Sequence, residues 1–380
     1  MLACVEPTPE RPDDSETRES VPVGDSTVEV LPDAPQVYDP WTVHTLTITL
    51  SEDEVDSLRA APTEWVVGEL LFDEHPLADV GVRLKGSSSF QPIDQKPAWK
   101  LKMDEFVPGQ RLLGLERMTL NNEVWDPTMM AETMAYWTFR ENGSLAPRTS
   151  YVAVTLNERY LGLYTLIESM DEGFLHANDQ DGSIWEMTRN CDFTGDCSCF
   201  EEQEGPAALA SIAQGCESTD AFDREALVAF LAVEQAVNHP DSYSWNLNNF
   251  FVVHDEASNA LSLSPWGADS TFIYAYPPDK PNPDCEPLHL DVDSRSSKGA
   301  LRAWCRADAE CDAQYEDKLL QIADWMDQVD LAGEMSRNAE LLQPWEELET
   351  HVNWTMEDRR ARIDCFEQWT AQRPAELRGL

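Results

Sequence analysis

The chain has 380 residues, of which 71 are acidic and 27 basic, so its formal net charge is −44. This length can bury a sizeable core in one large or two smaller lobes. A surface this acidic repels nucleic acid and anionic lipid, and this excludes binding of either one through a broad surface patch. A phosphorylated ligand could still bind, but it would need a local cationic pocket or a metal ion.

The first segment of the chain, residues 1–38, is rich in Pro, Asp, Glu and Ser, a composition that cannot bury a core and predicts a disordered tether. Its opening letters, MLAC, are similar to the end of a bacterial lipobox, in which the cysteine (here Cys4) is lipidated. The charged and apolar regions of a signal peptide do not precede it. We expect an extracytoplasmic protein of the bacterial cell envelope, either secreted or held at the membrane only through a lipid on Cys4.

The cysteines point to the same compartment. Nine are present, and all but Cys4 lie between residues 191 and 365 in loop-like surroundings. Their spacing fits no zinc pattern of the CxxC…CxxC kind. Eight cysteines predict up to four disulfides and an oxidising environment, with the connectivity left open.

The next segments predict a sheet-rich half. Residues 41–50 alternate polar and apolar side chains, as a strand does. Residues 51–61 begin with a serine cap and early acids, which favours a short helix. Three strands are expected at 64–72, 77–86 and 97–106, with the turn KGSSSFQPIDQK between the last two.

A long helix and a hairpin complete this half. Asp126 can cap the helix, Pro127 suits its first position, and Gly143 ends it. Residues 149–168 predict a β-hairpin with Asn157 in its turn. The N-terminal half is therefore expected to be a mostly antiparallel sheet with one inserted helix.

The second half is expected to be mainly helical. Residues 176–219, rich in Cys, Asp and Gly, predict an irregular segment pinned by disulfides. Apolar residues at helical spacing predict a helix over 220–239, residues 248–266 predict a second hairpin, and the pattern is helical from about residue 313. The predicted fold class is α+β.

Polar residues gather around this second hairpin. Asp241 directly follows the helix, Asn246 and Asn249 follow within eight residues, and Asp269 stands at the hairpin's far end. Carboxylate and amide oxygens suit a hard cation such as Mg²⁺, which commonly binds substrate phosphates. Phosphoryl transfer uses such a set together with a lysine. Each acid could instead only cap a helix or shape a turn.

Lysines are scarce, which makes their grouping informative. Lys100 and Lys102 share one face of a predicted strand, and Lys85 lies on the strand before it. A cationic face on so acidic a protein suggests an anionic ligand, although the same lysines could merely solvate a strand.

Several segments together resemble the spore-coat protein H (CotH) kinase family. They are VRLKGSSSF and KPAWKLKM, the stretch from LNNEVWDPTMM to LYTLIE, DSYSWNLNNFFVV, and PWGADSTF. The resemblance covers roughly residues 40–375. It implies a divergent two-lobed protein-kinase-like fold, with an antiparallel sheet lobe at 39–170 and a helical lobe at 171–375.

The resemblance also implies an activity, which is ATP-dependent phosphorylation of Ser or Thr on an unidentified extracytoplasmic protein, with Mg²⁺ or Mn²⁺. By position in the motifs, Lys102 is similar to the lysine that contacts the phosphates, and Glu132 is our candidate for its acidic partner. Further basic positions near the nucleotide are Lys96, Arg83 and Lys85.

In the helical lobe, Asp241 is similar to the catalytic aspartate and Asp269 to the metal-binding aspartate. Either Asn246 or Asn249 could be the second metal ligand. Glu168 is similar to a hinge residue beside the adenine.

The sequence departs from the family pattern at two places. Many members read PWDLD where this chain reads PWGAD, so Gly267 replaces the first acid. A GxGxxG phosphate loop is absent, and KGSSSFQP would have to bind phosphate through its backbone N–H groups and hydroxyls. The alternative function is a non-catalytic cell-surface binding protein or adhesin on the same fold.

Overall fold

Seven strands close into a barrel in this computed structural model, which describes residues 37–187, 190–195, 198–205, 209–272, 298–349 and 354–379. The described residues belong to one unit, Asp33–Leu380. Around the barrel the strands follow the order β1-β2-β3-β4-β5-β7-β6. Their bounds are β1 Val43–Thr49, β2 Val66–Phe72, β3 His75–Lys85, β4 Ala98–Lys102, β5 Arg117–Asn121, β6 Thr149–Leu156 and β7 Arg159–Ile167.

The barrel closes through one parallel pair. β1 pairs antiparallel with β2 on one side and parallel with β6 on the other, where Leu46 lies opposite Val154. The α+β class expected from the sequence is confirmed, but the expected antiparallel sheet lobe is a closed barrel with one parallel pair, which is not clearly a two-lobed kinase layout. Alternation along a strand tells which face is apolar and not which strand lies beside it, so closure could not be predicted.

The barrel interior is apolar, and the outer face of β3–β5 is basic. Val82, Leu84, Trp99 and Leu101 point inward, and each is at most 1% exposed. The residues between them point outward. Arg83 lies opposite Lys100, Gly81 lies opposite Lys102, and Lys85 is on the same face. The shared cationic face predicted for these lysines is therefore present.

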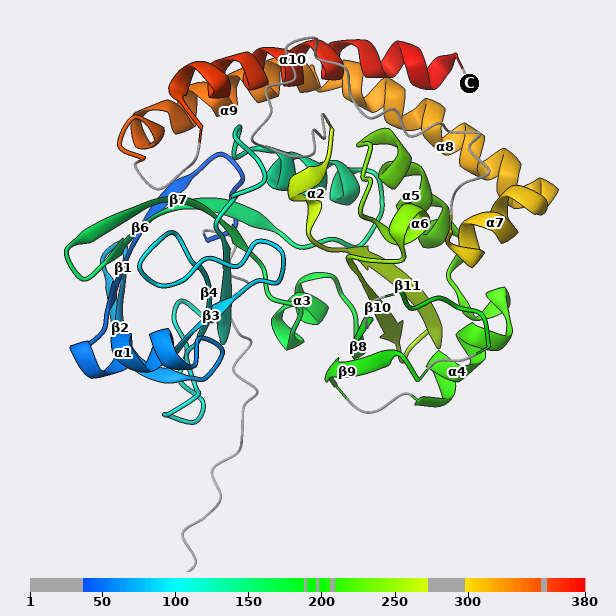
Figure 1. Ribbon diagram of the computed structural model, residues 1–380. Helices are drawn as coiled ribbons and strands as arrows, with labels where there is room; N and C mark the ends of the chain where they lie inside the picture. Colours follow the sequence, from blue (N-terminus) through cyan, green and yellow to red (C-terminus); the bar gives the residue numbers. More distant parts are fainter. Residues whose placement is uncertain are drawn as a thin grey trace, which may run out of the picture. The chain divides into compact units, whose positions relative to one another are not determined.

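A second sheet of four strands follows, in the order β11-β10-β8-β9, with helices beside it (Figure 1). Its strands are β8 Gly182–Met187, β9 Phe200–Glu204, β10 Phe250–Asp255 and β11 Ala260–Pro265. β8, β9 and helix α4 (Leu209–Glu217) lie within the segment 176–219 that was expected to be irregular. These elements are short, and β8 gains its order from pairing with β10, a contact remote in sequence.

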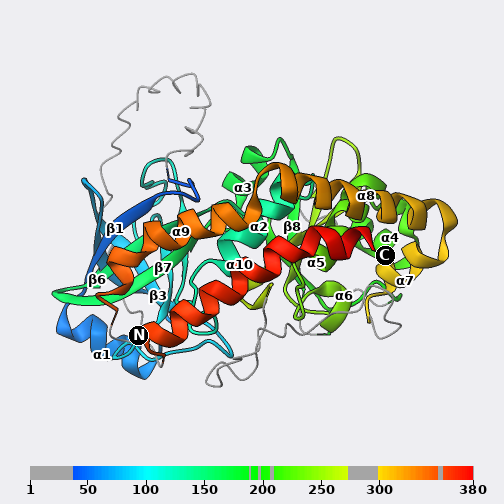
Figure 2. The ribbon, with the colours of Figure 1, turned by 90° about the horizontal axis from the view of Figure 1, so that it is seen from above.

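Helix α2 (Ala131–Glu141) lies between the barrel and the second sheet (Figure 1). Near the C-terminus, the long helices α8 and α9 follow one another along one line above it, and α10 runs alongside both (Figures 1 and 2). The remaining helices are α1 Glu52–Ala60, α3 Glu172–Ala177, α5 Arg224–Ala236, α6 Tyr243–Asn246, α7 Ala300–Ala307, α8 Ala309–Gln328, α9 Leu331–Glu346 and α10 Met356–Arg378, with single 3₁₀ turns at Thr219–Ala221 and Ala268–Ser270.

Disulfides are present, as the cysteine pattern predicted. Cys191 is bonded to Cys199 and Cys305 to Cys311. Cys216 and Cys365 are disulfide-bonded as well. These bonds are consistent with an extracellular or secreted protein. The predicted tether, Cys4 and two further cysteines, at positions 197 and 285, lie outside the described residues.

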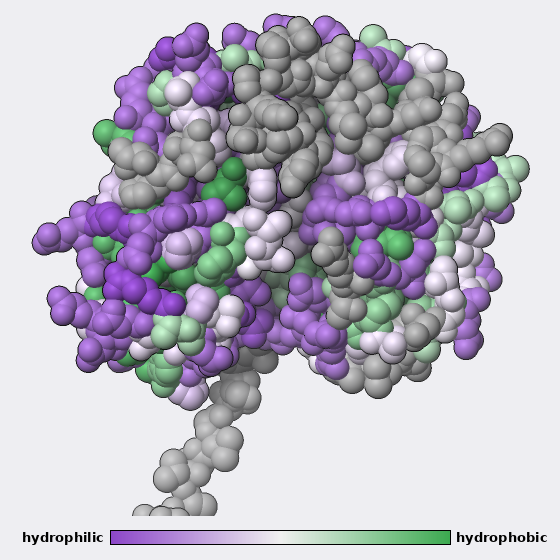
Figure 3. All heavy atoms as spheres, in the orientation of Figure 1, coloured by the Kyte–Doolittle hydropathy of each residue, from purple (hydrophilic) through white to green (hydrophobic). Residues whose placement is uncertain are grey.

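Two surface properties bear on partners. The face seen in Figure 3 is largely hydrophilic, in keeping with the excess of charged residues. Within the described residues, none of the helices combines the length and the apolar character that crossing a membrane requires.

Candidate functional site

The Asp241 carboxylate is held by three asparagine side chains. Asn248 Nδ2 and Asn249 Nδ2 donate to Asp241 Oδ2 over 3.0 and 2.9 Å, and Asn246 Nδ2 donates to Oδ1. The intervening helix α6 is short and ends at Asn246, and Leu247, which follows it, has a positive φ of 51°. The structure therefore gathers the cluster that the sequence placed within nine residues, and the amide donors fix the orientation of the acid.

His239 ties this loop to the loop after β11. The imidazole is fully buried, and its Nε2 lies 3.3 Å from the carbonyl oxygen of Trp266. Burial lowers the pKa of His239 to about 4, although the negative charge of Asp241 opposes the shift. The histidine is therefore neutral at physiological pH and serves as a link between the two loops.

Gly267 brings the asparagine cluster against the Asp269 loop. The Trp266 N–H donates to the carbonyl oxygen of Asn249 over 2.9 Å. Gly267 has φ +53°, and a Cβ built there would lie 2.9 Å from Cγ and Oδ1 of Asn249. Glycine adopts this φ readily and leaves room for the Asn249 side chain, so it allows the two loops to approach closely. Asp269 follows two residues later, half-buried.

Lys85, Asn121 and Glu132 form a hydrogen-bonded chain across three elements. Lys85 Nζ donates to Asn121 Oδ1, and Asn121 Nδ2 donates to Glu132 Oε2 over 2.6 Å. The hydroxyl of Tyr136 donates to the other oxygen of Glu132 over 3.0 Å. The sequence had assigned Glu132 to Lys102, whereas the structure places it with Lys85.

Asp269 interacts electrostatically with the hydrogen-bonded series Lys85–Asn121–Glu132. Burial lowers the pKa of Lys85 to about 8, while Glu132 and Asp269 favour its charged form. Burial, followed by the charges of Glu132 and Asp126, raises the pKa of Asp269 to about 8, and Lys85 opposes that shift. Charged side chains from β3, α2 and the loop after β11 therefore influence one another's pKa values.

Glu123 is a member of this site that sequence reasoning missed. It is 2% exposed, and neither of its carboxylate oxygens has a hydrogen-bond partner in the described part of the chain. Burial, Glu132 and Asp269 raise its pKa well above the ordinary value. Its φ of +52° is unusual for a residue other than glycine. No sequence signal marks it, because an acid after a strand is ordinarily a solvated turn residue.

Lys100 is a second cation whose charge acts on Lys85. Burial lowers its pKa, as do Arg83 and Arg117, and Glu186 of β8 opposes the shift. No hydrogen bond or ion pair to the Lys100 ammonium occurs in the segments that the structure describes. The charge of Glu186 partly offsets the two arginines, and a bound anion would offset the remaining positive charge of this face.

Two of the predicted basic residues are engaged locally. Lys102 Nζ lies 3.0 Å from Glu105 Oε2 and 3.8 Å from Asp104 Oδ1. Arg83 stacks 4.7 Å above the ring of Trp65. Both point outward on the same face as Lys85 without contacting Glu132.

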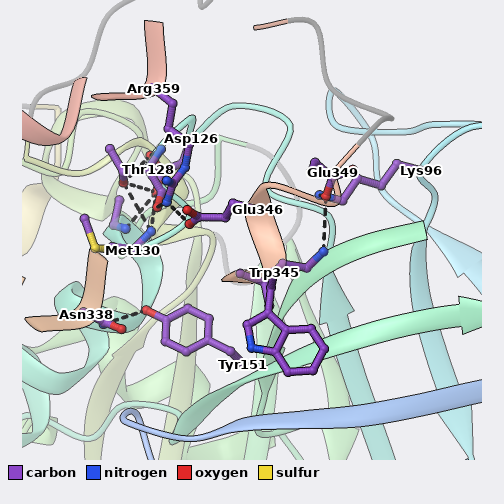
Figure 4. Close-up of polar contacts among 12 residues, drawn as sticks. Lys96, Asp126, Thr128, Met130, Tyr151, Asn338, Trp345, Glu346, Glu349 and Arg359 are labelled. Carbon is purple, nitrogen blue, oxygen red and sulfur yellow. Dashed lines mark hydrogen bonds and ion pairs between the residues drawn. The ribbon is translucent and has the colours of Figure 1, made fainter. Parts of the chain in front are cut away.

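Two other predicted residues are used inside the fold. Lys96 is fully buried, and its Nζ lies 2.8 Å from Glu349 Oε2 (Figure 4). Glu168 follows β7 at the exit from the barrel, and its carboxylate is held by the backbone N–H and the guanidinium of Arg148. The Lys96 ammonium is therefore not directed at a ligand, and Glu168 can contribute to a hinge only through its backbone.

The start of α2 is organised by Asp126. Its Oδ2 accepts from the backbone N–H groups of Met130 and Ala131 over 2.9 and 2.8 Å. The helix thus begins at Ala131, four residues after the Pro127 expected to open it, although Asp126 does supply the capping oxygen. This turn sets the position of Glu132, the next residue.

The acids of this site bear on the divalent cation that was expected from the sequence. Burial raises the pKa of Glu123, Glu132 and Asp269, and a bound cation would favour their charged forms. Across the described residues, no group of three or more His, Cys, Asp or Glu side chains is arranged to hold a metal ion by itself. Mg²⁺ needs only one or two protein carboxylates when phosphate oxygens complete its shell.

Part of the chain is similar to a known protein family. Residues 82–208 match the model described as CotH kinase protein. The matched part holds Lys85, Lys100 and Glu132, whereas Asp241 and Asp269 lie beyond it. No curated protein matches the chain.

Proposed function

We propose that this chain, a member of the CotH kinase family by the match over residues 82–208, transfers the terminal phosphoryl group of ATP to Ser or Thr hydroxyls of extracytoplasmic proteins. The observation that carries the proposal is the convergence of Lys85, Glu132 and Asp269. These groups come from β3, from α2 and from the loop after β11, and their charges act on one another. Phosphoryl transfer needs such a set because catalysis there is mainly positioning and charge neutralisation.

Lys85 and Lys100 are proposed to bind the phosphates. Lys85 is held by Asn121 and kept charged by Glu132, and Lys100 lies on the neighbouring strand without an acid in direct contact. This differs from the assignment drawn from the sequence, because Lys102 is already paired with Glu105.

Asp269 is the proposed metal ligand, with an asparagine as its partner. Asn246 Oδ1 accepts from Lys298 Nζ over 2.9 Å, whereas the Asn249 amide faces Gly267 on the Asp269 loop. We therefore favour Asn249. Bound Mg²⁺ would neutralise phosphate charge. The raised pKa of Asp269 fits this role, since a cation would offset the repulsion from Glu132 and Asp126.

Asp241 is proposed to orient the attacking hydroxyl. Its carboxylate is half-buried and fixed by the amides of Asn248 and Asn249, so the acceptor Ser or Thr would meet a preset acceptor oxygen. The hydroxyl proton would pass to this carboxylate as the oxygen attacks phosphorus.

The test is transfer of labelled γ-phosphate from ATP to a generic Ser-rich acceptor protein in the presence of Mg²⁺. Asp241→Ala and Asp269→Ala should abolish labelling. Asp255→Ala, in the hairpin of the second sheet, is the matched control and should retain it. Equal labelling by Asp269→Ala and the wild type would overturn the assignment. MgATP binding without labelling of any acceptor would instead favour a non-catalytic binding protein.

A further inference from the structure

Two buried carboxylates at the end of α9 contact different parts of the chain. Glu346 is the last residue of the helix, and Glu349 follows three residues later. Glu346 pairs with Arg359 of α10, and Glu349 pairs with Lys96 in the loop between β3 and β4 (Figure 4). The four side chains of these two ion pairs are each at most 3% exposed.

The first pair reaches the start of α2. Arg359 donates from Nη2 to the carbonyl oxygen of Thr128 over 3.2 Å. Thr128 belongs to the turn that Asp126 organises, since its N–H donates to Asp126 Oδ1 over 2.8 Å. The same acid accepts from the N–H of Ala131, immediately before Glu132. Three hydrogen bonds therefore lead from Arg359 of α10 to Ala131, the residue before Glu132.

The second pair reaches the other side of the same site. Lys96 is held by Glu349 through its ammonium, and its carbonyl oxygen accepts from Asn122 Nδ2 over 2.8 Å. Asn122 Nδ2 also donates to the carbonyl oxygen of Ser89 in that loop over 3.1 Å. Asn122 adjoins Asn121, so this pair fixes the backbone beside the amide that joins Lys85 to Glu132.

We propose that the end of α9 is a positioning device for the Lys85–Asn121–Glu132 chain, with Glu346 and Glu349 as positioning residues. The reason for two pairs is geometric. Glu132 and Asn121 come from different elements, and each needs its own anchor to keep the 2.6 Å hydrogen bond between them. The effect on catalysis rests on the proposed kinase function, whereas the effect on the position of α2 does not.

Loss of the Glu346 charge should be felt at the site because Arg359 would stay buried without its ion-pair partner, and Asp126 would remain as the acid whose charge favours the charged form of Arg359. In Glu346→Gln, Arg359 loses its counter-ion and is free to leave Thr128. Replacement of both partners by apolar residues, as in Glu346→Leu with Arg359→Met, should restore stability, since buried pairs are often replaceable in this way. The double variant still lacks the hydrogen bond to Thr128, so stability and positioning can be separated.

The primary readout is amide hydrogen exchange of peptides covering residues 121–136, which needs no enzymatic activity. We expect about tenfold faster exchange in Glu346→Gln and in the double variant, even where the latter regains the melting temperature of the wild type. Val154→Ala, in the barrel interior, is the control for general destabilisation. It should leave exchange of α2 within about twofold of the wild type once the melting temperatures are matched.

The second readout is the kinetics of phosphoryl transfer. The double variant should lower kcat by about tenfold and change KM less, because Glu132 supports the lysine that meets the phosphates. The proposal would be overturned if the exchange rate and kcat changed only as the melting temperature does, so that a double variant with the melting temperature of the wild type also had its exchange rate and kcat. Faster exchange of α2 in a chain that never transfers phosphate would uphold the positioning role and refute the kinase function separately.

Discussion

Replacing Glu234 with glutamine should change how the stability of the protein depends on pH. Glu234 lies fully buried in α5, and its carboxylate accepts from the hydroxyl and backbone N–H of Ser244, in the segment that follows Asp241. Burial raises the pKa of Glu234 from an ordinary 4.5 to about 7. The folded state therefore holds this proton more tightly than the unfolded state does.

The sign and size of the effect follow from linkage. Stability from the raised pKa is fully present below pH 4.5 and is lost as the pH rises through about 7. The shift from 4.5 to about 7 corresponds to about 3 kcal/mol in the free energy of unfolding, of which roughly 2 to 3 kcal/mol falls between about pH 5 and 8. Asp171 and Asp269, with pKa values raised to about 7 and 8, add losses of the same sign.

Glutamine keeps the size of the side chain and has no proton to lose. Denaturant unfolding of the wild type and of Glu234→Gln at about pH 5 and 8, with disulfides intact, measures the difference. The variant should lose roughly 2 to 3 kcal/mol less over this interval. Glu225→Gln, at an exposed position of the same helix, should behave as the wild type does. Equal pH dependence of Glu234→Gln and the wild type would refute the reasoning.

Three further predictions concern the site and the disulfides. Gly267→Ala introduces a Cβ 2.9 Å from the side chain of Asn249, at a residue with positive φ. The dissociation constant of MgATP, measured by calorimetry, should therefore rise about tenfold. An unchanged constant would contradict the role of this glycine. Lys85→Met should weaken ATP binding about tenfold or more. In Lys102→Met, which removes the partly exposed pair with Glu105, the dissociation constant of ATP should stay within about threefold of the wild-type value. A larger effect of Lys102→Met than of Lys85→Met would favour the assignment drawn from the sequence. Replacing Cys305 and Cys311 by serine removes a disulfide of sequence separation 6 and should lower the free energy of unfolding by about 2 kcal/mol, measured by thermal or denaturant unfolding. An unchanged free energy of unfolding would show that the bond is dispensable.

The sequence predicted best what is local in the chain. The cluster around Asp241 spans only nine residues, so the chain keeps the asparagines that follow this acid close to it. The hairpin of β10 and β11 then returns the chain beside Asn249 through antiparallel pairing, which brings the Asp269 loop back to the same place. Both features follow from a short helix, a turn and a two-stranded pattern.

The assignment of the lysine could not be made in this way. Lys85 and Lys102 share the outer face of β3 and β4, and the alternation of side chains treats them alike. Which of them meets Glu132 depends on Asn121, in the next strand, and on where α2 begins. Those are distances between segments, and a pattern along the chain does not contain them. The burial of Glu123 is of the same kind.

The parallel pairing of β1 with β6 has a consequence for how the polypeptide acquires its structure. Leu46 meets Val154, which lies 108 residues further along, so one side of the first strand stays unpaired while much of the intervening chain is made. Contacts of such long range are slow to form, and a bare strand edge invites association with other chains. Production at high concentration should therefore favour aggregates of newly made molecules, and a chaperone that shields this edge should raise the yield.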